Sequence, residues 1–269
     1  MNKPKPAITI NVDPTNPGQF FACCGLLELA ERLWHQSSDS SKPALGWFSG
    51  SQFFIATEGG LDKLVMALTS EVFIQVDPND KTASPIQIGG VFQQIQLDWW
   101  SDPRSGGKDL KVWAGTMESF RIARAMQNAM KGVRFTEAGI LDVGTIAYDP
   151  VDPETKVEPY YFDARRGPNA HSRDVGFSPN ALQLTTTAFP AVELLCLIGL
   201  QRCLPSKGKK VRTFEYFTWD TPIPTSLLQS MISGKIPAYR SQGYVFENWY
   251  RTGQKKHKSF RSATPMIQG

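Results

Sequence analysis

Histidine is scarce in this chain and stands in none of the patterns that common catalytic sites use. The 269 residues contain only His35, His171 and His257, and no HExxH or HxxxH pair occurs. A GxSxG nucleophile segment and a GxxxxGK[ST] phosphate loop are also absent. The carboxylates follow no spacing typical of a metal site. We therefore expect a protein that is not an enzyme and that needs neither a metal nor another cofactor.

Paired cysteines of the CxxC type are lacking as well. The four cysteines are Cys23, Cys24, Cys196 and Cys203, and each pair stands in an apolar, helix-like stretch. A structural zinc site usually draws on closely spaced Cys or His ligands, which this pattern does not offer. We expect buried, reduced thiols.

Long apolar runs are missing too. No stretch approaches the ~20 apolar residues of a membrane-spanning helix. Residues 1–6 are not followed by an apolar segment of the signal-peptide type. The expected location is therefore the cytoplasm, with no membrane partner. At 41% hydrophobic and 20% charged residues, the chain can build a sizeable core.

The charge is distributed unevenly along the chain. The formal net charge is only +4, but residues 202–269 carry twelve Lys and Arg against three acids, while the first hundred residues carry six against ten. Ten aromatic residues are interspersed in this basic region: Phe214, Tyr216, Phe217, Trp219, Tyr239, Tyr244, Phe246, Trp249, Tyr250 and Phe260. Cations and aromatic rings together suit RNA or single-stranded DNA, which offers phosphates and stacking bases. The alternative is a solvated basic face over an ordinary aromatic core.

The first 76 residues alternate in the order β-α-β-β-α-β. Strands are predicted at 7–12, 45–48, 52–57 and 71–76, and helices at 17–34 and 61–68. Asn16 resembles a helix N-cap, Pro17 a first helical residue and Gln19 a capping-box acceptor. This order is that of a ferredoxin-like or RRM-like unit.

The rest of the chain is a larger, basic α+β part. Strands are predicted at 91–100, 160–163, 212–219 and, broken at Gly243, 239–250; helices are predicted at 109–130, 189–204 and 224–233. We expect an α+β fold with an RRM-like lobe over residues 1–100 and a basic lobe over 101–269, although both parts could form one domain.

The densest polar segment is the predicted loop of residues 165–179. Arg165, Arg166, His171 and Arg173 lie on it together with a glycine, a combination that can hold a backbone phosphate. The alternative is a structural network in which the arginines pair with the aspartates at 163 and 174.

A second group of candidate residues lies in the basic C-terminal region. The segment 250–261 could be an arm laid on a phosphate backbone, or a disordered solubilising tail. The candidate nucleic-acid contacts of this region are Lys207, Lys209, Lys210, Arg251, Lys255, Lys256, Lys258 and Arg261.

Several motifs resemble a CRISPR-associated family. They are the string at 12–30 (VDPTNPGQFFACCGLLELA), GWF at 46–48, VWAG at 112–115, RDVGFS at 173–178, PAVELL at 190–195 and GLQR at 199–202. The chain thus resembles the smaller Csb-type protein of type I-G systems, formerly called I-U.

The resemblance implies a non-catalytic subunit of a type I RNA-guided, Cascade-like surveillance complex in antiviral defence. Such a subunit would contact guide RNA, target DNA and other Cas subunits. Many of these subunits belong to the RAMP superfamily, which is built on an RRM-like unit. The chain lacks the Gly-rich C-terminal loop and the evident histidine of guide-processing members, so a strand-binding role is favoured. The alternatives are a metal-dependent nuclease or guide-RNA processing enzyme, and an adaptor that binds only proteins.

Overall fold

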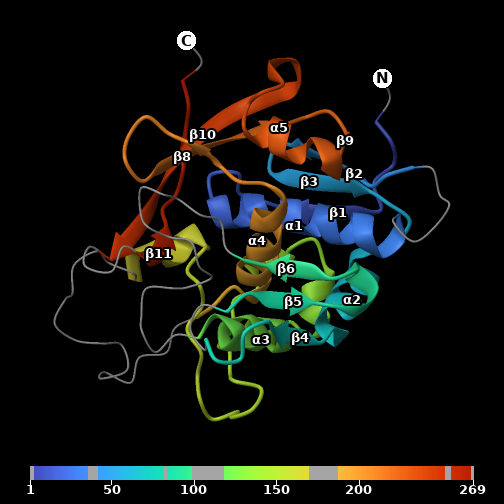
Figure 1. The fold of residues 1–269 in the computed structure, drawn as a ribbon. Helices are drawn as coiled ribbons and strands as arrows, with labels where there is room; N and C mark the ends of the chain where they lie inside the picture. The colour runs from blue at the N-terminus through green and yellow to red at the C-terminus, as the bar shows by residue number, and fades with distance from the viewer. Residues whose placement is uncertain are drawn as a thin grey trace.

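Helix α1 (Pro17–Trp34) runs through the centre of the fold in the computed structural model (Figure 1). Its start follows the sequence prediction: Asn16 Oδ1 accepts a hydrogen bond at 3.1 Å from the N–H of Gly18, and Pro17 is the first helical residue. Gln19 accepts a bond at 2.7 Å from the N–H of Asp13, three residues before the cap. Every residue from Pro17 to the alanine at position 30 is buried, so other elements cover this helix on all sides.

The structure describes residues 3–35, 42–80, 84–98, 118–169, 187–251 and 256–267. The other helices are α2 (Leu61–Ser70), α3 (Ser119–Ala129), α4 (Pro190–Arg202) and α5 (Leu228–Ile232). The strands are β1 (Ile8–Asn11), β2 (Leu45–Ser49), β3 (Gln52–Ala56), β4 (Phe73–Gln75), β5 (Ile86–Ile88), β6 (Ile95–Leu97), β7 (Ser206–Lys207), β8 (Thr213–Trp219), β9 (Ile223–Pro224), β10 (Arg240–Arg251), β11 (Lys256–Phe260) and β12 (Thr264–Pro265). The chain is therefore an α+β protein with antiparallel sheets.

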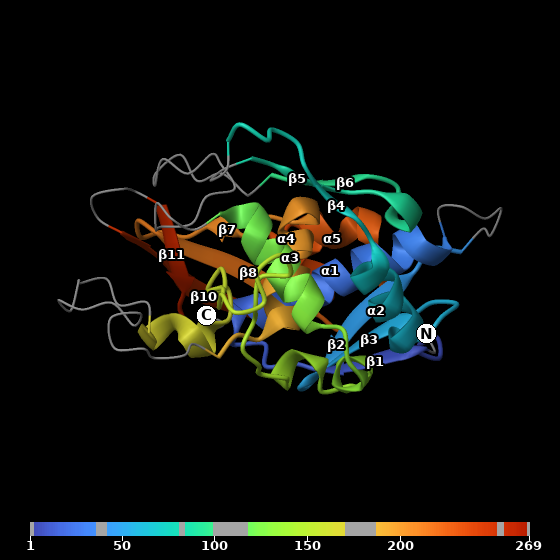
Figure 2. The ribbon, with the colours of Figure 1, turned by 90° about the horizontal axis from the view of Figure 1, so that it is seen from below.

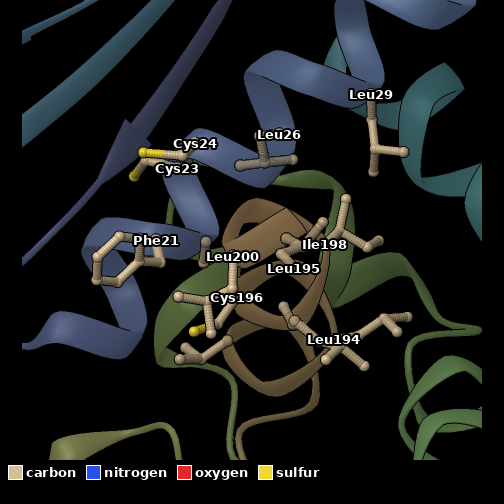
Figure 3. Packing of buried hydrophobic residues seen from close by; sticks show 14 of the residues in the cluster. Phe21, Cys23, Cys24, Leu26, Leu29, Leu194, Leu195, Cys196, Ile198 and Leu200 are labelled. Atoms are coloured by element: carbon tan, nitrogen blue, oxygen red, sulfur yellow. The ribbon is translucent and has the colours of Figure 1, made fainter. Parts of the chain in front are cut away.

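Helices α1 and α4 cross in backbone contact. A methyl group added at Gly199 would lie 2.0 Å from the carbonyl oxygen of Phe21, and one at Gly25 would lie 2.1 Å from that of Leu195. Only glycine permits this approach. Leucine, isoleucine and cysteine side chains from both helices fill the space around the crossing (Figure 3). All four cysteines are buried and free, as predicted, and burial raises the pKa of each thiol.

An ion-paired cluster joins α1 to the last turn of α4. Glu28, which is 3% exposed, accepts hydrogen bonds from Arg32 at 2.6 Å and from Arg202 at 2.6 and 2.7 Å. Burial alone would raise the pKa of Glu28, but the two guanidinium groups outweigh this effect and lower it. The carboxylate is therefore held in its charged form.

The N-terminal sheet has the order β1-β3-β2-β9, with neighbours antiparallel. The first three strands have the neighbours expected in a ferredoxin-like unit. The fourth strand of such a unit would lie beside β1, but β4 pairs with β5 in another sheet. A complete RRM-like unit is therefore not confirmed. Strand β9, from the C-terminal half of the chain, extends the sheet at β2 instead.

A small sheet, β4-β5-β6, lies on the other side of the central helices. Figure 2 shows α1, α3 and α4 between this sheet and the strands β1, β2 and β3. The predicted strand at 91–100 is shorter, since a 3-10 turn (Gly90–Phe92) precedes β6, and β5 was not predicted. The predicted helix at 109–130 is described only from residue 118, where α3 follows.

A third sheet, β11-β10-β8-β7 with β12 beside β10, contains most of the basic C-terminal region. Strand β10 carries a register shift between Arg240 and Gly243, where the sequence predicts a break. The basic tail is neither a free arm nor a solubilising tail over its described part. It forms β11, and the ring of Phe260 is fully buried.

One aromatic cluster connects the N-terminal sheet, α1 and the C-terminal sheet. The ring centroid of Phe20 lies 5.4 Å from that of Phe48 in β2 and 4.3 Å from that of Tyr216 in β8. Trp219 Nε1 donates to the carbonyl oxygen of Gly46 at 2.8 Å. The hydrophobic core is thus continuous from Ile8 to the alanine at position 263. The predicted lobe boundary near residue 100 falls outside the described residues.

Candidate nucleic-acid interface

The two faces of the C-terminal sheet differ, because side chains alternate along its strands. Phe214 and Tyr216 of β8, and Tyr244 and Phe246 of β10, point into the core and are buried. Trp219 and Phe260 are buried too. Six of the ten aromatic residues that made the region resemble a stacking surface therefore serve as core. The alternative interpretation, a basic face over an aromatic core, is correct for these six.

The outer face of the same sheet is hollowed into a groove of about 530 Å³. Thr213 and Glu215 of β8 line it together with Val245 and Glu247 of β10. The remaining lining residues are Lys209, Lys210, Phe246, Arg261, Ser262, Thr264 and Met266. Lysines thus stand on one side of the groove, an arginine on the other, and two glutamates between them. We name this feature the outer groove.

A hydrogen-bonded turn positions the two lysines. The Thr213 hydroxyl donates to the carbonyl oxygen of Lys210 at 2.7 Å, and the N–H of Gly208 donates to the carbonyl oxygen of Thr213 at 2.8 Å. Lys209 and Lys210 are exposed at the tip of this turn. Lys207 is exposed as well, but in the register of β7 it lies opposite Phe214, whose side chain points into the core. The sheet therefore separates Lys207 from the outer groove.

Arg261 is held at the opposite side by the strand that precedes it. Buried Phe260 anchors the chain, and the N–H of Arg261 donates to the carbonyl oxygen of Glu247 at 3.0 Å. The guanidinium carbon of Arg261 lies 3.9 Å from the ring centroid of Trp249. This cation–π stack fixes the position of the guanidinium group.

Arg165, on the 3-10 turn Ala164–Asn169, belongs to a structural network. Its guanidinium group donates to Asp163 Oδ2 at 2.7 Å, to Asp142 Oδ1 at 2.7 Å and to the carbonyl oxygen of Leu141 at 2.7 Å. It also lies 3.6 Å from the ring centroid of Phe189. Two carboxylates thus compensate its charge. This geometry matches the structural alternative for Arg165 and removes the main support for a phosphate contact there.

Asp163 and Glu193 form a buried carboxyl junction behind Arg165. Both are 0% exposed, and Glu193 accepts hydrogen bonds from the N–H groups of Phe162 at 3.2 Å and Asp163 at 3.1 Å. Burial, together with the nearby charge of Asp163, raises the pKa of Glu193 to about 8. The structure has no strand at the predicted 160–163; Tyr161 adopts a φ of 65° there.

The other predicted contacts lie on the 3-10 turn, in the C-terminal strands or outside the described residues. Arg166 is partly buried on the 3-10 turn, which packs against β11. Arg251, Lys256 and Lys258 lie in β10 and β11, where only their backbone is described. The structure thus brings the turn of Arg165 and Arg166 next to the basic strand β11. His171, Arg173 and Lys255 lie outside the described residues.

Sequence reasoning missed Glu215, Glu247 and the stack of Arg261 on Trp249. Alternation within β8 and β10 could have placed the two glutamates on the face opposite the buried rings. The stack could not have been found this way, because it depends on the pairing of β10 with β11 (register Trp249 to Ser259).

Within the described residues, no group of three or more His, Cys, Asp or Glu side chains could hold a metal ion. None of the helices described is both long and apolar enough to cross a membrane. Comparisons with protein-family models, with curated proteins and with solved structures found no match to this chain.

Proposed function

We propose that this chain is a non-catalytic subunit of a type I CRISPR surveillance complex, where it holds the backbone of guide RNA or target DNA and contacts neighbouring Cas subunits. The motif resemblance described above supports the CRISPR assignment. The neighbours of β1, β3 and β2, which match part of an RRM-like sheet, are compatible with a RAMP-type relationship.

The outer groove is the observation that carries the nucleic-acid part of the proposal. Neither Lys209 nor Arg261 pairs with a carboxylate in the described part of the chain, so their charges face solvent across the groove. Cations in this state release counterions when they meet phosphates, which favours binding. Arg165, by contrast, already has its carboxylate partners.

A salt titration tests the role of the lysines. We expect Lys209→Glu with Lys210→Glu to weaken binding of a fluorescent oligonucleotide. If two single-strand phosphate contacts are lost, the slope of log affinity against log salt should fall by about 1.4. The measurement is fluorescence anisotropy at several salt concentrations.

Lys207→Glu is the control, because it reverses one charge two residues away but beyond the sheet, while the double variant reverses two. A loss of binding free energy in the control of half or more of that in the double variant would indicate a general charge effect and contradict the assignment to the outer groove.

Purification with partners tests the CRISPR part of the proposal. The chain would be co-expressed with its neighbouring genes and a CRISPR array, and any bound RNA would be sequenced. Guide-length RNA together with large partner subunits is the expected result. A monomer free of RNA would contradict a stable place in such a complex.

An exposed apolar surface favours a second candidate, an adaptor that binds only proteins. Val72, Ile74 and Val76 alternate on and around β4 and are 69%, 50% and 48% exposed. In the described chain β4 is the end strand of its sheet. Exposed apolar surface of this kind often marks a protein contact. An adaptor would assemble with other Cas subunits at high salt, and Ile74→Lys would abolish that assembly.

A further inference from the structure

The charges of the outer groove have an order that a simple basic patch would lack. In the strand register, Glu215 is opposite Val245 and Glu247 is opposite Thr213, so the two glutamates are diagonal neighbours on the outer face. Such neighbours have Cα atoms roughly 7–8 Å apart. The cations of Lys209, Lys210 and Arg261 flank them. A phosphate backbone is therefore attracted to the sides of the groove and repelled from its floor.

The stack of Arg261 on Trp249 adds a flat surface at one side of the groove. The guanidinium carbon lies over the indole ring of Trp249, 3.9 Å from its centroid. Arg261 is exposed and also lines the groove. An exposed, planar guanidinium group is a platform on which an unpaired base can stack. Phe260 and the backbone bond to Glu247 hold this platform in place.

We propose that the outer groove binds single-stranded nucleic acid in one orientation, with the backbone along Lys209 and Lys210 and an unpaired base stacked on the Arg261 guanidinium group. This inference deepens the proposed function and rests on it. The volume of about 530 Å³ is within the range of pockets for small ligands, which suits an unpaired nucleotide and not a duplex.

The floor carboxylates give this orientation a chemical selectivity. A base that points into the groove meets Glu215 and Glu247, which accept hydrogen bonds and cannot donate them. Cytosine presents its N4 amino donor to such an acceptor. Uracil presents a carbonyl oxygen at the same position, which a carboxylate repels. The groove therefore prefers cytosine to uracil.

The test is fluorescence anisotropy with the purified full chain and ten-nucleotide probes. We expect C10 to bind about tenfold more tightly than U10, and both to bind more tightly than a ten-base-pair duplex. RNA and DNA versions of each probe show whether the 2′-hydroxyl matters. Equal affinity for C10, U10 and the duplex would overturn the inference.

Arg261→Lys tests the contribution of stacking apart from that of charge, because lysine keeps the positive charge but has no planar guanidinium group. We expect about tenfold weaker binding of C10 with an unchanged salt slope. Arg240→Lys is the matched control: Arg240 also stacks on a ring, that of Phe217 at 5.2 Å, but does not line the groove. Thermal unfolding of both variants checks that each is folded.

Glu215→Gln with Glu247→Gln tests the floor. Because an amide group both donates and accepts, the preference for C10 over U10 should disappear while binding remains.

The outcomes distinguish this inference from the proposed function. If the double lysine variant loses binding while Arg261→Lys and the glutamine variant behave like the unchanged chain, the nucleic-acid interface stands and the stacked orientation is wrong. If the unchanged chain binds no probe, the nucleic-acid part of the proposed function and the stacked orientation are both wrong.

Discussion

Arg165 shows that the position of a cation in the sequence does not by itself indicate what it contacts. The sequence places it on a glycine-containing loop, as expected for a phosphate contact. In the structure it joins Asp163, Asp142 and the carbonyl oxygen of Leu141. Asp163 in turn accepts from Asn16, the cap of α1, at 2.9 Å. The arginine thus completes a polar junction between segments far apart in the sequence.

The buried carboxyl of Glu193 makes the stability of the protein depend on pH. Its pKa of about 8 in the folded state lies above the ordinary 4.5, so the folded chain binds more protons than the unfolded chain between these values. The free energy of unfolding therefore falls as the pH rises from about 4.5 to about 8, by up to about 1.4 kcal/mol per pH unit, and then levels off. Urea unfolding at pH 6, 7 and 8 measures this slope.

Glu193→Gln should flatten the slope between pH 6 and pH 8, because an amide does not titrate. The free energy of unfolding of this variant should also be lower. The amide nitrogen cannot accept the hydrogen bond from a backbone N–H that one carboxyl oxygen accepts in the unchanged chain. Exposed Glu58→Gln is the control and should keep the slope. A slope that survives in Glu193→Gln would show that another group causes it.

The contact between helices α1 and α4 depends on two glycines. Alanine usually stabilises a helix interior relative to glycine by roughly 0.5–1 kcal/mol. At position 199 its methyl group would instead lie 2.0 Å from the carbonyl oxygen of Phe21, which forces the helices apart. We expect Gly199→Ala to lower the free energy of unfolding by about 3 kcal/mol in urea denaturation.

Gly139→Ala is the control for this change. A methyl group there meets nothing within 4 Å, and the φ of Gly139 is −81°, which alanine adopts readily. Its stability should change by less than about 0.5 kcal/mol. If the two variants were equally stable, the close helix crossing would be contradicted.

Local signals predicted many elements. Asn16 and Pro17 indicated the start of α1, and Pro190 the start of α4. Short apolar runs indicated β2 and β3, and β8 was predicted at 212–219. Strand β11 was missed because its sequence is polar and basic; pairing with β10 and the burial of Phe260 stabilise it. The partner of β4 was also missed, since strand order depends on tertiary pairing that periodicity does not encode.

The described residues form one hydrophobic core, to which both halves of the chain contribute. Strand β9 completes the N-terminal sheet, and α4 covers α1. We expect a fragment of residues 1–98 to show no cooperative thermal transition, because α1 would lack its cover. Circular dichroism of the fragment beside the full chain measures this. A sigmoidal transition in the fragment would instead support an independent N-terminal lobe, as the composition allowed.

The candidate interface was predictable only as a region. Charge asymmetry located it in residues 202–269, but could not separate Lys209 and Lys210 from Lys207, which lie on opposite faces of one sheet. That separation depends on strand register, a property of paired strands and not of one strand.

The burial of α1 by α4 also has a consequence for synthesis on the ribosome. Glu28 and its partner Arg202 are 174 positions apart. At a translation rate of about 5–20 residues per second, roughly 9 to 35 s pass between the emergence of α1 and that of α4. Throughout this interval the apolar helix α1 is not yet buried against α4. Exposed apolar segments of this kind are what chaperones bind.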